Sequence, residues 1–371
     1  MIERQDRIFG AIGHWAERCW AGHEKERLRE GYVASLQIDY HSDLKEVQSD
    51  EALARLLSDA QQHAPFDRLA WWQGLVEHCG ILPVLAVAKS ADGVAILPLC
   101  GHRGQLSALA NWYTFRFRPI LSGEAPLQAL ARDLGRRTHR VTLHGLPEED
   151  GSMSTLTRAF KATGWLVRRE VCDTNRVLPV MERSFEDYLA GRPGKLRTTL
   201  KRKSGKVTTR VLSRFDAEAW KQYEAIYSES WKPEEGSPAF LRTFAEAEGT
   251  AGRLRLALAH AADAPEGPAI AAQMWTVEGG TAFIHKLAHR EAAKPLSPGS
   301  VLTAALMRHV IEIDRVDLVD FGTGDDRYKQ DWMETQRPRY RLDMFRPFDP
   351  RNWASLAGIG LRSLAASAKR G

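Results

Sequence analysis

Alternating and continuous apolar runs, bounded by glycine and proline, divide this chain into short strands. Apolar runs at residues 81–88 and 94–99 flank an Asp-Gly turn, which predicts a β-hairpin. A similar arrangement recurs at residues 254–260, 269–275 and 281–288, where glycine-containing turns again separate the apolar runs. The pattern therefore predicts an antiparallel sheet region in each half of the chain.

Apolar residues at helical spacing surround these strands. The clearest case is a stripe formed by Leu302, Leu306, Val310 and Ile313. Helices are predicted within residues 51–78, with a turn at Pro65, and at 127–136, 155–163 and 299–313. Short strands are predicted after the last three helices, at 141–144, 165–167 and 316–321. Each half thus runs helices, hairpin, helix and strand, which indicates an internal duplication of an α/β unit.

The repeated order predicts two domains with extensions at both ends. We expect a helical N-terminal extension at residues 1–50, a first domain at 51–175, a second at 176–345 and an amphipathic C-terminal tail at 346–371. A chain of 371 residues favours two domains over one, because single cores stop growing near ~250–300 residues. The expected fold class is α/β (α+β), with a mixed, mostly antiparallel sheet and flanking helices in each unit.

Composition and charge describe an ordinary globular protein. The net charge of +5 is too small to indicate nucleic-acid binding alone, but it suits an anionic ligand or lipid surface. The four cysteines include no C-x-x-C pair, which argues against a zinc ribbon and favours a reducing compartment. No apolar stretch approaches the ~20 residues that span a bilayer, and the N-terminus lacks signal-peptide features. We expect a cytoplasmic protein.

The segment 320–329, DFGTGDDRYK, carries more chemistry than a turn requires. A turn needs glycine and one Asp, whereas here several carboxylates stand beside Tyr328 and Lys329. Asp320 should be partly buried on its strand, with Lys329 or Arg327 as its partner. The segment predicts part of an active site. The alternative is a structural Asp–Lys pair that holds the loop while Tyr328 packs.

A second segment, Ser297-Pro-Gly-Ser300, opens the predicted helix at 299–313. Backbone N–H groups at a helix start, together with the helix dipole, form an anion site. The simpler interpretation is a serine N-cap and a proline that need no ligand.

These two segments and three further motifs together resemble a known family. The three further motifs are Tyr188-Leu-Ala-Gly-Arg-Pro-Gly-Lys-Leu-Arg197, Ser230-Trp-Lys232 and the hairpin ending in Leu97-Pro-Leu99. The second half resembles a GNAT acetyltransferase domain of the branch described as cellulose-biosynthesis-type. That branch is distantly similar to Fem-type aminoacyl transferases, which contain two GNAT-like units. The resemblance spans roughly residues 80–345 and implies tandem GNAT-like units.

The resemblance implies a thioester donor, either acyl-CoA (or acetyl-CoA) as co-substrate or an acyl carrier protein, and no metal. Ser297, Gly299 and Ser300 would hold the pyrophosphate of CoA, although the usual glycine-rich signature is reduced here. The strand at 281–288 would hold the thioester, with Lys286 and Leu287 as donor-binding residues.

The same resemblance implies an acid–base mechanism. His285 or an acid of the opening segment, Asp320 or Asp325, would take the acceptor proton, Tyr328 would protonate the departing sulfur, and Lys329 would supply charge. For His285 the alternative is a histidine at the edge of the core. We expect His285, Leu287 and His289 on one face of their strand and Lys286 on the other.

Aromatic residues next to cations are candidates for the acceptor site. Trp231 and Lys232 form one such pair, and Trp112 and Arg116 form another in the first half. They would bind an amine or hydroxyl of an envelope saccharide or amino-lipid, although the same residues would suit a core or a domain interface.

Two basic segments each allow two interpretations. The acid-free run at residues 195–210 is either a solvated helix face or a rim that attracts an anionic donor. The tail at 353–370 either lies on the inner face of an anionic membrane, as a peripheral contact, or packs as a C-terminal helix. The alternative functions are an aminoacyl-tRNA-dependent Fem-like transferase and a non-catalytic scaffold. DNA is not an expected partner.

Overall fold

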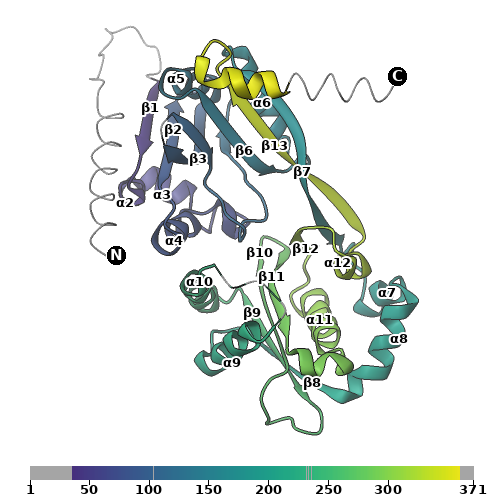
Figure 1. The fold of residues 1–371 in the computed structure, drawn as a ribbon. Helices are drawn as coiled ribbons and strands as arrows, with labels where there is room; N and C mark the ends of the chain where they lie inside the picture. Colours follow the sequence, from purple (N-terminus) through teal and green to yellow (C-terminus); the bar gives the residue numbers. More distant parts are fainter. Residues whose placement is uncertain (1–35, 103, 231, 233, 235, 360–371) are drawn as a thin grey trace, which may run out of the picture.

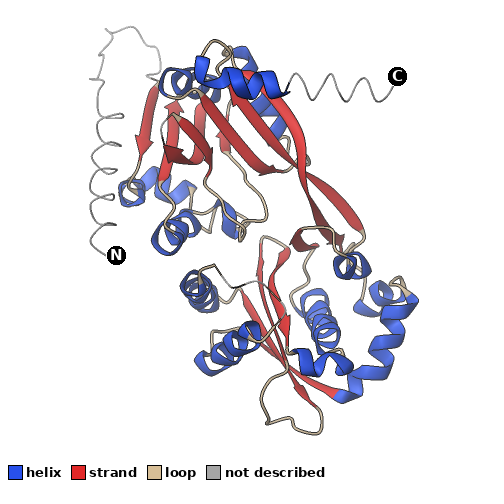
Figure 2. Ribbon diagram, viewed as in Figure 1, coloured by secondary structure: helices blue, strands red, loops and turns tan. Residues whose placement is uncertain are grey.

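The computed structural model describes residues 36–359 except 103, 231, 233 and 235. All thirteen strands of the described residues join one large sheet, with helices on both faces (Figures 1 and 2). The strands are β1 (Gln37–His41), β2 (Pro83–Ser90), β3 (Gly93–His102), β4 (Gln105–Ala108), β5 (Ile120–Ser122), β6 (Arg140–Leu146), β7 (Leu166–Pro179), β8 (Val207–Leu212), β9 (Leu254–Ala261), β10 (Ala271–Glu278), β11 (Thr281–His289), β12 (Leu318–Thr323) and β13 (Thr335–Phe345).

Helices occupy most of the connections between strands. They are α2 (Leu44–Ser49), α3 (Glu51–Leu56), α4 (Leu69–Cys79), α5 (Ala125–Arg137), α6 (Ser152–Ala162), α7 (Phe185–Ala190), α8 (Gly194–Lys203), α9 (Ala217–Ser228), α10 (Pro238–Thr250), α11 (Pro298–Arg308) and α12 (Arg327–Trp332). Among the residues that the structure describes, no helix is long and apolar enough to cross a membrane.

The sheet has the same strand order when read from either end. The full order is β1-β2-β3-β4-β6-β13-β7-β12-β11-β10-β9-β8, with β5 beside β3. In each half an antiparallel series leads to one parallel pair, β4 with β6 and β11 with β12. The long strands β7 and β13 are exchanged, because β13 lies beside β6 and β7 lies beside β12. This repeated order is what an internal duplication produces.

The predicted hairpins are present as β2–β3 and β9–β10–β11. The helix predicted at 299–313 is α11 followed by a π-helical turn at His309–Ile313. The predicted helical extension at 1–50 lies mostly outside the described residues, and its described part contains strand β1. The boundary predicted between residues 175 and 176 falls inside β7. We propose the two domains as units that share β7 and β13.

Three apolar clusters cover the sheet. On one face a single cluster joins both halves and includes residues of α4, α9 and α10. On the other face, α5 and α6 cover the first half while α8 and α11 cover the second. Leu196 and Leu200 of α8 are buried, and Arg197 and Lys201 are exposed, so this basic helix packs by its leucines and presents its cations to solvent.

Aromatic rings form the contact between the halves within the shared cluster. The ring of Trp71 lies 5.0 Å from those of Phe240 and Phe244, edge to face in both cases. Phe66 contacts Trp71 at 4.9 Å and Phe283 of β11 at 5.6 Å. Such pairs add ~0.5–1.5 kcal/mol each beyond the area they bury.

A buried ion network lies beside these rings. Arg68 donates from Nη2 to Glu248 and Glu278, both at 3.1 Å, and all three side chains are at most 6% exposed. Arg253 adds a second cation, with its Nε 2.7 Å from Glu248. Because these charges are out of water, each depends on its partners.

We predict that Arg68→Met destabilises the protein by about 3–5 kcal/mol, because it leaves two buried carboxylates short of a cation. Urea unfolding of both proteins measures the difference. The control is Arg242→Met, which removes a half-exposed partner of Glu246 and should cost less than ~1 kcal/mol. Equal losses in the two variants would contradict the assigned role of the network.

Candidate active site

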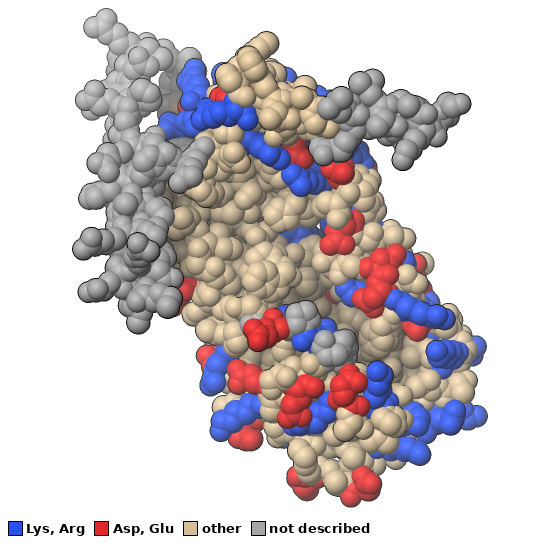
Figure 3. Space-filling model, viewed as in Figure 1, with Lys and Arg blue, Asp and Glu red and all other residues tan. Residues whose placement is uncertain are grey.

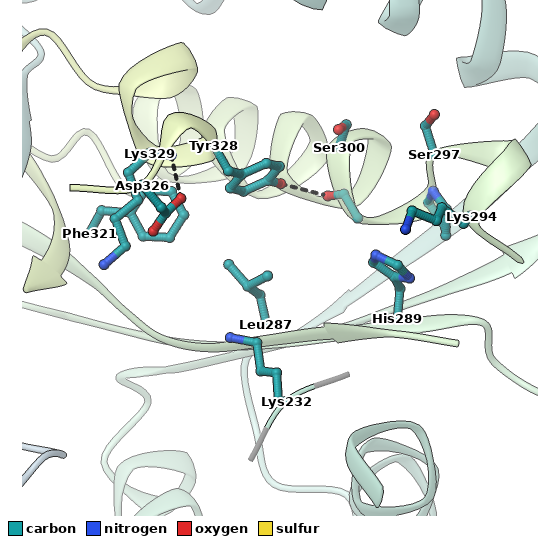
Figure 4. Close-up of a pocket in the computed structure, with 12 residues that line it drawn as sticks. Lys232, Leu287, His289, Lys294, Ser297, Ser300, Phe321, Asp326, Tyr328 and Lys329 are labelled. Carbon is teal, nitrogen blue, oxygen red and sulfur yellow. Dashed lines mark hydrogen bonds between the residues drawn. The ribbon is translucent and has the colours of Figure 1, made fainter. Parts of the chain in front are cut away.

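A cavity of about 580 Å³ lies between the end of β11, the start of α11 and α12 (Figure 4). Its lining combines a helix start, a phenol and several cations. The lining residues are Lys232, Leu287, His289, Lys294, Ser297, Pro298, Gly299, Ser300, Phe321, Asp326, Tyr328 and Lys329. The predicted site residues Lys232, Leu287, Ser297, Gly299, Ser300, Tyr328 and Lys329 are therefore brought together at one cavity.

The start of α11 forms one wall of the cavity. Ser297 has a left-handed backbone (φ 53°) and its side chain makes no capping hydrogen bond, while Pro298 occupies the first turn. Ser297 therefore occupies the N-cap position and Pro298 the first turn, as the simpler interpretation expects, but the serine side chain caps no backbone N–H. First-turn N–H groups have no acceptor within their own helix, so the amides of Gly299 and Ser300 are suited to an anion.

Tyr328 forms the adjacent wall and points toward the helix start (Figure 4). Its hydroxyl lies 2.8 Å from Thr303 Oγ1 and donates to the carbonyl of Gly299 at 3.3 Å. Its ring packs against Phe321 and Trp332. Burial raises the pKa of Tyr328 to about 12, against the opposing hydrogen bond to Thr303. At neutral pH the residue is thus a fixed phenol that retains its proton.

Lys329 follows Tyr328 on a helix rather than in a loop, which corrects the predicted conformation. Helix α12 begins after Asp326, whose carboxylate accepts from the Lys329 amide at 3.1 Å. The Lys329 ammonium donates to the carbonyl of Thr323 and lies 5.4 Å from the centre of the Phe321 ring. Burial lowers the pKa of Lys329, although the nearby Asp326 acts in the opposite direction.

Asp320 is buried as predicted, but its partner is neutral. Its carboxylate accepts from Asn175 Nδ2 at 2.9 and 3.0 Å and from the Gly322 amide at 2.7 Å. The prediction of Lys329 or Arg327 as partner is therefore wrong. Asp320 does not line the cavity. It holds the turn at Gly322, where φ is 69°, and Asn175 is a site-supporting residue that sequence analysis missed.

Asp325 also lies outside the cavity lining. Its carboxylate forms an ion pair with Arg176 Nη2 at 2.6 Å and accepts from Gln330 at 3.1 Å. These hydrogen bonds lower the pKa of Asp325. The residue ties the segment before α12 to strand β7, so the structure gives it a positioning contact and no access to the cavity.

His285 is in the aromatic core and does not line the cavity. Its Nε2 lies 2.8 Å from Thr276 Oγ1, and rings including Phe115 and Phe244 surround it at 5.3 and 5.2 Å. Burial, with a smaller effect of the Lys286 charge, lowers the pKa of His285 to about 3. The imidazole is therefore neutral and enclosed, and the interpretation as a core histidine fits its surroundings.

A β-bulge explains why the predicted face of β11 is wrong. The register with β10 shifts between Met274 and Trp275, which leaves His285 as the extra residue on β11. An extra residue reverses the alternation of side chains beyond it. Leu287 and His289 consequently face the cavity, and His285 does not.

Lys286 lies away from the cavity as well. Its Nζ is 4.6 Å from the centre of the Tyr113 ring and 5.5 Å from that of Tyr227. Both are cation–π contacts, and the one with Tyr113 joins the two halves. The donor-binding role predicted for Lys286 therefore has no support from its position, whereas Leu287 does line the cavity.

His289 and Lys294 line the cavity although neither was a predicted site residue. His289 Nδ1 lies 3.1 Å from the carbonyl of Arg290, which orients the ring. The sequence feature that could have indicated His289 is its position at the end of an apolar strand. The direction of its side chain, however, depends on the bulge.

The residues predicted for the acceptor site do not lie together in the structure. Lys232 lines the described cavity and a second one of about 540 Å³, whose other lining residues come mainly from α9 and α10. Trp231 lies outside the described residues. Trp112 is 66% exposed and its ring lies against Gly236. Arg116 donates to Asp67 at 2.7 Å. Neither Trp112 nor Arg116 lines either cavity.

Comparisons with known proteins agree with this architecture. Residues 194–330 match the family described as acetyltransferase (GNAT) domain, and none of the curated proteins matches the chain. A domain of a protein assigned as lysylphosphatidylglycerol synthetase from Agrobacterium fabrum is 13% identical, with a TM-score of 0.54 over 87% of this chain and 98% of that one.

Two further solved structures are similar over most of the chain. FemX is 11% identical, with a TM-score of 0.52 over 82% of this chain and 96% of its own. L-PGS from Bacillus licheniformis is 14% identical, with a TM-score of 0.51 over 83% of this chain and 92% of its own. At these identities the likeness is one of fold.

The family match runs from α8 into α12 and includes β11 and α11, which line the cavity, and the strand order repeats in the other half. Residues 194–330 of this chain thus match the GNAT acetyltransferase domain, and the sheet as a whole has a tandem GNAT-like fold.

Proposed function

We propose that this protein transfers an acyl group from a thioester donor, acyl-CoA or an acyl carrier protein, to an amine or hydroxyl of an envelope saccharide or amino-lipid. The observation that carries the proposal is the Tyr328 phenol beside the uncapped start of α11 in one cavity. A helix start suits the phosphate groups of a donor, and a protonated phenol suits a departing thiolate.

The charges around the cavity support an anionic donor. Lys232, Lys294 and Lys329 line it, against the single carboxylate of Asp326. That carboxylate already accepts the amide of Lys329. The three lysines and the positive N-terminal end of the α11 dipole both attract negative charge. A pyrophosphate or phosphopantetheine group is therefore the donor chemistry that fits.

The strand geometry supports a place for the thioester. Strands β11 and β12 pair only from Thr281 to Phe283 and then separate. Backbone groups of β11 beyond this point are therefore not used by β12. We propose that main-chain N–H groups near Leu287 polarise the thioester carbonyl.

The reaction needs a base as well as an acid. We assign the base to His289, in place of His285, because His289 lines the cavity. It would take the proton of the acceptor amine or hydroxyl, directly or through water. The acceptor would form its bond to the acyl carbon, the carbon–sulfur bond would break, and Tyr328 would give its proton to the sulfur.

The second cavity is the proposed acceptor site, since it shares Lys232 with the first. Its aromatic lining by Trp220, Tyr223 and Tyr227 suits the apolar body of an amino-lipid or the face of a sugar.

A second candidate function is an aminoacyl transferase that uses aminoacyl-tRNA. The exposed cations Lys195, Arg197, Lys201 and Arg202 on and near α8 favour it, because they would attract a nucleic-acid backbone. The name of one similar protein, lysylphosphatidylglycerol synthetase, denotes a product in which an amino acid is attached to a phospholipid. That name is consistent with this candidate. A non-catalytic scaffold is the third alternative.

Donor binding distinguishes these functions. We predict that acetyl-CoA or a long-chain acyl-CoA binds in isothermal titration calorimetry, and that Ser300→Asp weakens binding about tenfold, because it adds an anion to the helix start. The control is Ser184→Asp, which adds the same charge at the start of α7. Absence of binding to either donor would refute the CoA assignment and favour the tRNA, carrier-protein or scaffold alternatives.

Tyr328→Phe tests the proton donor. We predict a loss of about 100-fold or more in the rate of thiol release from the donor, with little change in melting temperature because the ring is retained. Release is measured with a thiol reagent across a panel of amines and sugars. Tyr40→Phe is the control, since it removes a phenol that donates to Asp133 at 2.7 Å in the first half. A fully active Tyr328→Phe enzyme would exclude the assigned role.

A further inference from the structure

Two exposed aromatic side chains follow the last strand. After Phe345 ends β13, Phe348 is 90% exposed and Trp353 is 59% exposed. Residues 353–359 continue as a helix at the outer end of the first half (Figure 1). Single exposed apolar residues are common, but two aromatic rings five positions apart at one end of the sheet need an explanation.

A small cavity of about 230 Å³ lies at the same place, and four of its eight lining residues are arginine. Phe348 contributes to its wall, so the cavity and the exposed ring form one surface. The lining residues are Gly135, Arg136, Arg137, Thr138, Arg346, Phe348, Asp349 and Arg351. On the face shown in Figure 3, blue side chains gather at this end beside the C-terminal segment. We call these residues, together with Trp353, the arginine–aromatic surface.

The carboxylates near this surface do not balance its cations. Asp133 is shared by Arg137, at 2.7 Å, and by Arg136, at 4.0 Å. Asp349 pairs with Arg351 at 2.6 Å. Arg136 and Arg351 are 76% and 61% exposed along their side chains.

Arg346 is held by a neutral partner. It donates to the carbonyl of Thr163 at 3.3 Å and lies 5.6 Å from the centre of the Trp165 ring. Four guanidinium groups thus face two carboxylates. Arg136 and Arg137 are in the last turn of α5 and also offset the negative end of its dipole, but a net positive charge remains at the surface.

We propose that the arginine–aromatic surface docks this protein on a bilayer that contains anionic phospholipid. Arginine recognises phosphate through paired N–H groups. Aromatic rings next to such cations are typical of the membrane–water interface. A surface with both features fits a lipid headgroup layer better than a free phosphate ion, which would leave Phe348 and Trp353 in water. The proposal does not depend on the transferase reaction.

The position of the surface is compatible with activity at the membrane. It belongs to α5 and the segment after β13 in the first half, whereas the active-site cavity is built from β11, α11 and α12 in the second half. In Figure 1, α5 lies at the top of the molecule, whereas β11, α11 and α12 lie in its lower half. Docking would therefore leave the active-site cavity uncovered.

Vesicle co-sedimentation of the full chain tests the proposal. One vesicle preparation contains phosphatidylcholine alone, and the other contains equal parts of phosphatidylcholine and phosphatidylglycerol. We predict binding to the anionic vesicles only. Phe348→Ser should weaken it about tenfold, and Arg136→Ala about fivefold. The substituted side chains are exposed, so the melting temperature should not change.

Matched controls separate this surface from charge or hydrophobicity in general. Lys221→Ala removes one positive charge on α9, and Met181→Ser removes an apolar side chain that is 76% exposed elsewhere; both should bind like the unmodified chain. Equal binding to both vesicle types would refute the role of the arginines. Unchanged binding by Phe348→Ser and Arg136→Ala would place the contact elsewhere, for example in residues 360–371. Absence of any vesicle binding would also overturn the proposal and leave an acidic protein as the occupant to test.

Discussion

The pairing of β7 with β13 is the constraint on which the rest of this structure depends. The two strands are antiparallel along their length, from Thr335 opposite Val177 to Phe345 opposite Leu166. Each is also the neighbour of the other half's last short strand. Without this exchange the sheet would divide into two incomplete sheets with exposed edges, which proteins avoid.

The exchange also builds the candidate active site. Strand β7 comes from the first half, yet its Asn175 holds Asp320 and its Arg176 holds Asp325 on the segment that leads into α12. That helix carries Tyr328 and Lys329 to the cavity. Asp320 and Asp325 are therefore engaged in placing the chain, whereas Asp326, the phenol, the ammonium and the start of α11 line the cavity. Substrate chemistry and positioning are divided between neighbouring residues of one short segment.

The contact between the halves adds a second requirement. Phe66, Trp71 and the Arg68 network of the first half pack on β11 and α10 of the second. His285 is enclosed among these rings in its neutral form. The first half thus supports the back of the strand whose other face lines the cavity, which gives a physical reason for retaining a half that the GNAT family match does not cover.

Local pattern in the sequence was sufficient for the hairpins, the apolar stripe of α11, the repeated order of elements and several cavity residues, among them Ser300, Tyr328 and Lys329. These features depend on which residues are apolar and at what spacing. The position of β13, the bulge at His285 and the pairing of Asn175 with Asp320 were decided only in the tertiary structure. Contacts with distant segments determine which strands pair and where an extra residue enters the ladder. The periodicity within a single strand contains no information about either. For that reason the sequence indicated a histidine on β11 near the site, but only the folded sheet determined that His289, and not His285, faces the cavity.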